Sequence, residues 1–225
     1  MTPPAICIKD LEKSYNGTRA LDGVSLEIGD GQFFGLLGPN GAGKTTTINI
    51  LSGLVLKDRG KTEVFGMDTV KDYRTTRSKI GIAAQELPQD WFFPIETLLY
   101  FQAGYYGITR KKAGPNVKRL LKRLGLTGKK EARLRQLSGG MKRRYQLAKA
   151  LVHDPKIIIQ DEPTAGVDVE FRHDMWKLFR ELHGDGKTIL LTTHYIEEAE
   201  MLCEDIGIID EGKIIARGKP KDLTK

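Results

Sequence analysis

A glycine-rich loop constrains the fold of this chain more than any other feature. The loop runs Gly38-Pro39-Asn40-Gly41-Ala42-Gly43-Lys44-Thr45 and is followed by Thr46. It lies between an apolar run at 33–37 and an amphipathic stretch at 45–54, which is the strand, loop and helix context of the pattern G-x-x-x-x-G-K-[ST]. Backbone N–H groups of such a loop, with the positive end of the helix, bind phosphate oxygens. The sequence therefore predicts a P-loop fold.

The side chains of this loop predict its ligand. Lys44 would contact the terminal phosphates of a nucleoside triphosphate and stabilise charge during phosphoryl transfer, and the Thr45 hydroxyl would bind Mg²⁺. We expect residues 38–46 to bind ATP. The alternative is a glycine-rich turn that binds nothing, and it leaves the Lys-Thr pair without a role. The loop by itself indicates only a P-loop nucleoside triphosphatase.

Apolar runs alternate with amphipathic stretches along most of the chain. Strands are expected at 33–37, 80–84, 157–159, 188–192 and 206–209, and helices at 45–54, 141–151, 171–182 and 196–202. This alternation predicts an α/β P-loop core with a mainly parallel sheet, preceded by an N-terminal antiparallel β region around 6–9 and 24–28. We expect one domain, 1–225, with a catalytic core at 1–85 plus 138–225. Residues 86–137 show helical stretches at 97–106 and 116–124 and predict an inserted α-helical lobe.

Composition limits the compartment and the ligands. The longest charge-free stretch near the middle, 97–109, is shorter than the ~18 apolar residues that cross a bilayer, and the first residues do not read as a secretory signal. Cys7 and Cys203 each lie in an apolar segment, which predicts buried thiols and no disulfide. We expect a cytoplasmic chain. The net charge of +7 favours phosphates, nucleic acid or an anionic membrane face without choosing among them, and the basic run at 111–130 is also typical of a solvated helix face.

Two adjacent carboxylates follow a second apolar run. Asp161 and Glu162 come directly after Ile157-Ile158-Ile159-Gln160, at the carboxyl end of a predicted strand, where α/β sheets bind ligands. Asp161 would bind Mg²⁺ through water, and Glu162 would polarise the attacking water as a catalytic group. The alternative is a pair of solvated acids at a strand end. Gln160 has no predicted function, but its amide needs hydrogen bonds or costs about 1–3 kcal/mol when buried.

A second anion-binding turn follows at Leu137-Ser138-Gly139-Gly140-Met141-Lys142-Arg143-Arg144. The Ser-Gly-Gly turn opens a basic amphipathic helix, whose N-terminus also attracts anions. One nucleotide does not need two such loops. In this order the motifs resemble the ABC ATPase family, whose signature is Leu-Ser-Gly-Gly followed most often by Gln; Met141 replaces that Gln. The resemblance implies that Ser138, Gly139 and Gly140 cap the ATP of a second ATPase subunit in a head-to-tail dimer, expected to be a homodimer.

Four further residues match marks of the same family. The resemblance implies that Tyr15 stacks on adenine, that Gln85 contacts Mg²⁺ and water, that Asp168 lies in the loop crossing the dimer interface, and that His194 contacts the γ-phosphate as a catalytic group. Ala165-Gly166-Val167 before Asp168 departs from the commoner Ser-Gly-Leu. The alternatives are a solvated tyrosine, a loop amide, a turn aspartate and a structural histidine.

The resemblance spans residues 6 to about 223 and is greatest to bacterial ATPase subunits of ABC-2-type exporters. It implies an ATPase that uses ATP and Mg²⁺ to drive a multidrug, lipid or polysaccharide exporter. Such a chain would bind an integral-membrane permease subunit and lie on the cytoplasmic face of the inner (plasma) membrane. The alternative is an ABC-type ATPase acting on nucleic acid or in regulation without a membrane partner. No nucleic acid is expected, because the sequence has one ATPase domain and no sustained heptads between its motifs.

An aromatic cluster falls in the predicted lobe. Its members are Trp91, Phe92, Phe93, Tyr100, Phe101, Tyr105 and Tyr106. These rings either form the core of the lobe or line a groove for a short helix of the permease, as helix-in-groove contacts do elsewhere. The sequence leaves both interpretations open.

Overall fold

Side-chain alternation on the central strands determines the layers of this fold. The computed structural model of the chain describes residues 2–84 and 92–223. On β3 (Phe33–Leu37), Phe33 and Leu37 pack into one hydrophobic cluster, and Phe34 and Leu36 pack into the other. β7 (Ile157–Asp161) and β8 (Thr188–Thr193) are likewise buried along their whole length. A sheet covered on both faces accounts for the uninterrupted apolar runs in the sequence.

Two sheets form the scaffold. The six-stranded sheet has the order β10-β9-β3-β8-β7-β6, where β6 is Ile80–Ala83, β9 is Asp205–Asp210 and β10 is Lys213–Gly218. Its strands are parallel except for the antiparallel pair of β9 and β10. β1 (Ile6–Tyr15), β2 (Thr18–Ile28), β4 (Arg59–Val64) and β5 (Met67–Asp68) form an antiparallel sheet in the order β2-β1-β4-β5. The predicted α/β fold with an N-terminal antiparallel region is confirmed.

Helices cover both faces of the six-stranded sheet. α1 (Lys44–Leu51) shares a cluster with residues of the antiparallel sheet, since Ile48 packs together with Ile6 and Ile28. α5 (Gly139–Leu151), α6 (Val169–Gly184) and α7 (Ile196–Leu202) contribute to the cluster on the opposite face. α2 (Tyr73–Lys79) leads into β6, and α8 (Pro220–Leu223) ends the described chain. Within the described residues, every helix is too short or too polar to span a bilayer.

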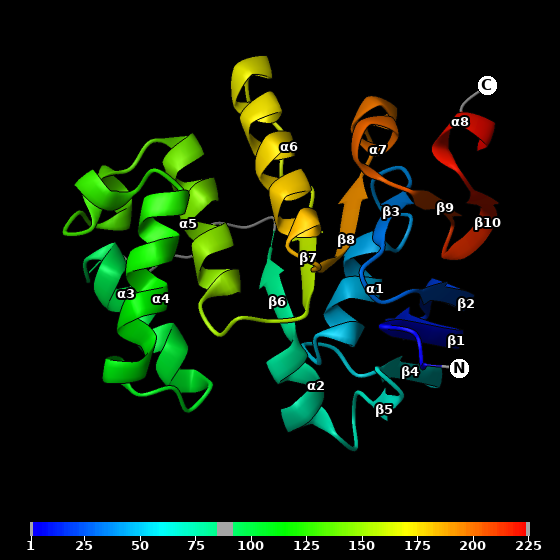
Figure 1. The fold of residues 1–225 in the computed structure, drawn as a ribbon. Coiled ribbons are helices and arrows are strands. Elements are labelled where there is room, and N and C mark those ends of the chain that lie inside the picture. The colour runs from blue at the N-terminus through cyan, green and yellow to red at the C-terminus, as the bar shows by residue number, and fades with distance from the viewer. Residues whose placement is uncertain (1, 85–91, 224–225) are drawn as a thin grey trace.

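Two helices lie beside α5 at one end of the molecule (Figure 1). They are α3 (Ile95–Tyr105) and α4 (Arg110–Arg123), followed by the short 3₁₀ turns η1 (Thr127–Lys129) and η2 (Leu134–Gln136). α5 contacts β6 as well as α3 and α4, and one hydrophobic cluster runs through all three helices. We propose that 86–137 is the lobe, that 1–85 and 138–225 form the catalytic core, and that the lobe packs on the core through α5.

The basic residues, the cysteines and the aromatic residues singled out in the sequence differ in their exposure. Basic side chains of α4 such as Lys118 and Lys122 are exposed, as predicted for a solvated helix face, and Cys7 and Cys203 are buried and not joined in a disulfide. Among the clustered aromatics, Tyr100 packs on the core and Tyr106 stacks on His153 with ring centroids 3.6 Å apart. Four rings are exposed: Phe92, Phe93, Phe101 and Tyr105. Trp91 lies outside the described residues. Part of the cluster is therefore core, and part remains available for contact.

Candidate nucleotide-binding site

The loop between β3 and α1 is tightly packed against its surroundings. A Cβ atom on Gly38 would lie 2.2 Å from the carbonyl oxygen of Ile209, and one on Gly43 would lie 2.7 Å from Leu21 Cδ2. Gly43 also caps α1 with a φ of 110°, which only glycine adopts readily. The loop and the first turn of α1 border a cavity of about 270 Å³, lined by Asn40, Gly41, Gly43, Lys44, Thr45, Thr46 and Glu162. A cavity of about 420 Å³ beside α4 is larger, but the predicted site residues do not line it.

Lys44 is held inside this loop. Its side chain is 4% exposed, and Nζ donates to the carbonyl oxygens of Gly38 at 2.7 Å and Pro39 at 3.0 Å. The same nitrogen lies 3.2 Å from Glu162 Oε1. A buried ammonium needs such partners to offset the cost of desolvation. Lys44 therefore already points toward the cavity that a phosphate would occupy, with a carboxylate beside it.

Asp161 joins the carboxyl end of β7 to the start of α1. Its Oδ2 accepts a hydrogen bond from Thr45 Oγ1 at 3.2 Å, and its Oδ1 accepts one from Thr192 Oγ1 at 2.5 Å. A hydroxyl and a carboxylate this close are the hard oxygen ligands that Mg²⁺ uses together with water and substrate phosphates. Thr45 and Asp161 therefore fit the predicted Mg²⁺ site. No cluster of three or more His, Cys, Asp or Glu side chains suited to a metal occurs in residues 2–84 and 92–223.

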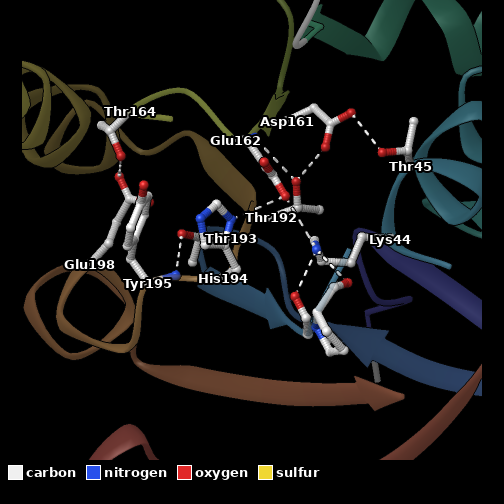
Figure 2. A network of polar contacts seen from close by, with 12 residues as sticks. Lys44, Thr45, Asp161, Glu162, Thr164, Thr192, Thr193, His194, Tyr195 and Glu198 are labelled. Atoms are coloured by element: carbon white, nitrogen blue, oxygen red, sulfur yellow. Dashed lines mark hydrogen bonds and ion pairs between the residues drawn. The ribbon is translucent and has the colours of Figure 1, made fainter. Parts of the chain in front are cut away.

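Glu162 and His194 meet at the edge of the cavity (Figure 2). Glu162 Oε1 lies 3.4 Å from His194 Nδ1, and the Glu162 side chain is 9% exposed. The Glu162 backbone has a φ of 47°, in the left-handed region that non-glycine residues rarely adopt. Its N–H donates to the carbonyl oxygen of Thr192 at 3.1 Å. The turn after β7 thus directs the carboxylate toward both Lys44 and His194.

The serine and glycines of the second anion-binding turn lie apart from this cavity. Ser138 is the N-cap of α5 and accepts a hydrogen bond from the Met141 N–H at 3.3 Å; Ser138 and Gly139 are exposed. Figure 1 shows α5 and α1 on opposite sides of α6. Residues 138–140 do not line the cavity at the phosphate loop. Within one chain, the two predicted anion sites remain separate.

Tyr15 and Asp168 do not line the cavity. Tyr15, at the end of β1, is 44% exposed, with Lys13 Nζ 5.3 Å from its ring centroid. Asp168 is exposed and caps α6, where its Oδ1 accepts a hydrogen bond from the Phe171 N–H at 2.7 Å. Gln85 lies outside the described residues. The roles predicted for these three side chains remain predictions.

Three polar side chains in buried strands and helices escaped the sequence analysis or had no predicted role. Thr192 is 0% exposed, and its hydroxyl contacts Asp161 and also accepts from the Glu162 N–H at 3.2 Å. Glu198 is also 0% exposed. Gln160 is 1% exposed, and its Nε2 finds no partner among the described residues. A polar residue inside an apolar run is the signal that could have drawn attention to Thr192.

Comparisons with known proteins test the resemblance that the motifs indicate. Residues 21–165 match the ABC transporter family. This chain belongs to the ABC transporter family. It is 43% identical to "Nod factor export ATP-binding protein I" of Burkholderia pseudomallei strain 1710b over 225 residues, which is 100% of this chain and 74% of that protein. Its identity to the protein of the same name from Paraburkholderia xenovorans strain LB400 is 43% over 223 residues, covering 99% and 73%.

Solved structures of ABC proteins share the fold of this ABC family member. CbiO1 from Clostridium perfringens, part of the ABC transporter complex CbiONQ, superposes with a TM-score of 0.87 at 29% identity, covering 99% of this chain and 91% of CbiO1. A dimeric ATP-binding cassette in a post-hydrolysis state, bound to ADP and Pi, has a TM-score of 0.87 at 26% identity, covering 96% and 98%. The predicted identity as an ABC-type ATP-binding chain is therefore confirmed.

Proposed function

We propose that this chain is the ATP-hydrolysing subunit of an ABC exporter. The observation that carries the proposal is a cluster at the carboxyl ends of β3, β7 and β8: Lys44 and Glu162 line one cavity, Asp161 contacts Thr45 of its lining, and His194 contacts Glu162. The names of the two relatives, both export ATP-binding proteins, support export as the direction. We further propose the ABC-2 type, with a drug, lipid or polysaccharide as the cargo.

The geometry indicates how these side chains divide the chemistry. A triphosphate entering the cavity would compete with Glu162 for Lys44, since both anions bind the same ammonium. Glu162 would then accept a hydrogen bond from the attacking water, and His194 would orient that carboxylate and contact the γ-phosphate. Thr45 and Asp161 would hold Mg²⁺, which would neutralise charge at the phosphate oxygens. Because phosphoryl transfer requires mainly positioning and charge stabilisation, these groups suffice on one side of the nucleotide.

The other side of the nucleotide requires a second chain. Ser138 and Gly139 are exposed and distant from their own phosphate loop, so we propose that they cap the ATP of a partner subunit in a head-to-tail homodimer. Asp168 would lie at the same interface, and Tyr15 would stack on the adenine of its own chain. ATP binding would close the dimer, and hydrolysis would reopen it.

A membrane partner would couple this cycle to transport. Phe92 and Tyr105 are 78% and 83% exposed, and Phe93 packs edge-to-face on Phe101 with centroids 5.2 Å apart. We propose that these rings contact an integral-membrane permease, which would hold the chain on the cytoplasmic face of the membrane. Photo-crosslinking from position 92 or 105 to a co-expressed permease tests this contact, and Lys118 on the exposed face of α4 serves as the control position. Equal crosslinking from all three positions would contradict it.

Replacement of the proposed catalytic carboxylate tests the ATPase assignment. Glu162→Gln should still bind ATP, because Lys44 and the loop are intact, but should lose most phosphate release and accumulate ATP-dependent dimers. Size-exclusion chromatography with and without ATP measures the dimer, and phosphate release measures turnover. Glu131→Gln, at a side chain 73% exposed in the lobe, is the matched control. Full hydrolysis by Glu162→Gln would overturn the assignment.

Nucleic acid remains a second candidate partner because of the basic, exposed face of α4 and the net charge of +7. Binding of DNA or RNA through that face would weaken steeply with salt, since each neutralised phosphate releases a counterion. Fluorescence anisotropy can measure the affinity for nucleic acid between roughly 50 and 300 mM KCl, where such phosphate contacts weaken. This measurement separates the two proposals. A steep slope together with ATP-dependent binding would favour this second function.

A further inference from the structure

Glu198 is a buried carboxylate that the proposed chemistry does not use. It lies on α7, is 0% exposed, and its Oε1 accepts two hydrogen bonds: from Thr164 Oγ1 at 2.8 Å and from Trp176 Nε1 at 3.0 Å. Its Oε2 has no partner within residues 2–84 and 92–223. A carboxylate is costly to bury, so a site that retains one with only half of its oxygens bonded points to a specific use.

The two donors come from two different parts of the fold. Thr164 follows Glu162 by two residues in the turn after β7, whereas Trp176 lies on α6. Glu198 itself follows His194 by four residues, in the first turns of α7. Glu198 Oε1 therefore joins the segment that carries Glu162 to the segment that carries His194. Through Trp176 it also joins both segments to the middle of α6.

The same two segments already meet at the cavity. Glu162 Oε1 and His194 Nδ1 lie 3.4 Å apart there, and Figure 2 shows the hydrogen bond from Thr164 to Glu198 to one side of them, joining the same two segments. His194 lies two residues before α7, and the N–H of the N-cap Tyr195 donates to Thr193 Oγ1 at 3.0 Å across it. A displacement of the first turn of α7 would therefore change the separation of Glu162 and His194.

We propose that Glu198 is a positioning residue for ATP hydrolysis, which sets the separation of Glu162 and His194 through its hydrogen bond to Thr164. This inference rests on the proposed function. The bond also holds Thr164, at the start of the loop that ends at Asp168, so it connects that loop to the segment that carries His194. The bond to Trp176 secures the carboxylate against α6 and has a structural role.

The two donors allow these roles to be separated. Thr164→Val removes the hydroxyl at nearly constant shape, and Trp176→Phe removes the indole N–H but keeps a ring in the core. We expect Thr164→Val to lower kcat by about tenfold with KM for ATP within about twofold, because the phosphate loop is untouched. Trp176→Phe should lower the melting temperature and leave kcat within about twofold. Unchanged kcat in Thr164→Val, or equal losses of kcat in both variants, would overturn the proposal.

Substitution of the carboxylate itself gives an independent comparison. Glu198→Gln retains an oxygen acceptor for both donors and should keep kcat within about threefold of the wild type. Glu198→Leu removes the acceptor and should reproduce the kcat loss of Thr164→Val; if this variant does not fold, Thr164→Val decides alone. Loss of kcat in Glu198→Gln as large as in Glu198→Leu would contradict positioning through Oε1. Absence of ATP hydrolysis in the wild type would instead defeat the proposed function, so the two failures are distinguishable.

Discussion

Thr192 organises both carboxylates at the end of β7. Its hydroxyl is the donor to Asp161 Oδ1 and an acceptor for the Glu162 N–H. Without it, the buried Asp161 Oδ1 would lose this partner, which costs about 1–3 kcal/mol, whereas the Glu162 N–H would keep its bond to the Thr192 carbonyl oxygen. Because Asp161 is the proposed Mg²⁺ ligand, this loss should appear in catalysis as well as in stability.

Thr192→Val should therefore impair Mg²⁺-dependent hydrolysis. We expect kcat to fall by about tenfold and the Mg²⁺ concentration for half-maximal activity to rise, since outer-shell partners of metal ligands typically matter by about 10–100-fold. Thr192→Ser keeps the hydroxyl and should retain most of the activity. ATPase rates measured over a MgCl₂ titration check this expectation. A Mg²⁺ dependence that is identical in Thr192→Val and the wild type would contradict it.

His153 makes stability depend on pH. Burial lowers its pKa from 6.5 to about 4, although its bond to the Ile80 carbonyl and nearby Asp154 oppose the shift and Lys187 adds to it. The folded state keeps the ring neutral while the unfolded chain binds a proton below pH 6.5. The stability that neutral His153 contributes is thus fully present above about pH 6.5 and is lost as the pH falls toward 4.

Wild-type protein should lose about 1 kcal/mol of unfolding free energy from this group between pH 7.5 and 5.5. His153→Phe can preserve the stack on Tyr106, whose ring lies parallel to the imidazole, and has no proton to gain. Its unfolding free energy should therefore fall less over the same interval. Urea titrations at the two pH values measure the difference. Equal pH dependence in both proteins would show that His153 does not stay neutral in the fold.

Individual site residues were predictable where their neighbours in sequence define the chemistry. Lys44 follows the loop glycines, and Asp161 and Glu162 end an apolar run, so each was found from local pattern. The partners of Glu198 were not, because Thr164 and Trp176 are 34 and 22 residues away and only packing brings them together. Long-range contacts of single side chains leave little trace in one sequence.

The start of α5 contains two adjacent glycines with different surroundings. A Cβ on Gly140 would lie 2.8 Å from Phe171 Cε2, whereas nothing lies within 4 Å of one on Gly139. Gly140→Ala should therefore displace the Phe171 ring and destabilise the fold by about 1 kcal/mol. Gly139→Ala should leave the unfolding free energy within about 0.5 kcal/mol, yet both variants should lose ATP hydrolysis if the turn contacts a nucleotide on a partner. Urea unfolding and ATPase rates provide the comparison; full activity of Gly139→Ala would argue against that contact.

Helices and strands were predictable where one face is apolar, and they escaped prediction where it is not. β4 reads RGKTEV, with Thr62 and Val64 as its buried residues, and α2 buries only Thr76, so neither has an apolar stripe. The helix predicted at 45–54 ends at Leu51, because Gly53 takes a left-handed φ of 72°. Leu54 continues the apolar period but is 74% exposed. Leu54 therefore lies on the surface beyond the end of α1, and the apolar periodicity wrongly assigned it to the helix.

The separation of the two predicted anion sites within one chain makes the proposed dimer testable. In a head-to-tail pair, each nucleotide contacts the phosphate loop of one chain and the Ser138 turn of the other. Lys44→Ala disables the first contact and Ser138→Arg the second, so either variant alone should be inactive at both sites. Ser138→Arg also removes an N-cap, at a cost of about 1 kcal/mol, which the fold should tolerate.

Mixing the two variants should restore ATP hydrolysis. A pair with one chain of each kind has one doubly defective site and one intact site, composed of Lys44 from one chain and Ser138 from the other. With random pairing, half of the dimers are mixed and half of their sites are intact, so recovery should approach roughly a quarter of the wild-type rate. Phosphate release measured across mixing ratios should peak near equimolar protein. If both loops instead served a nucleotide within one chain, no ratio would restore activity, because neither variant would supply a complete site.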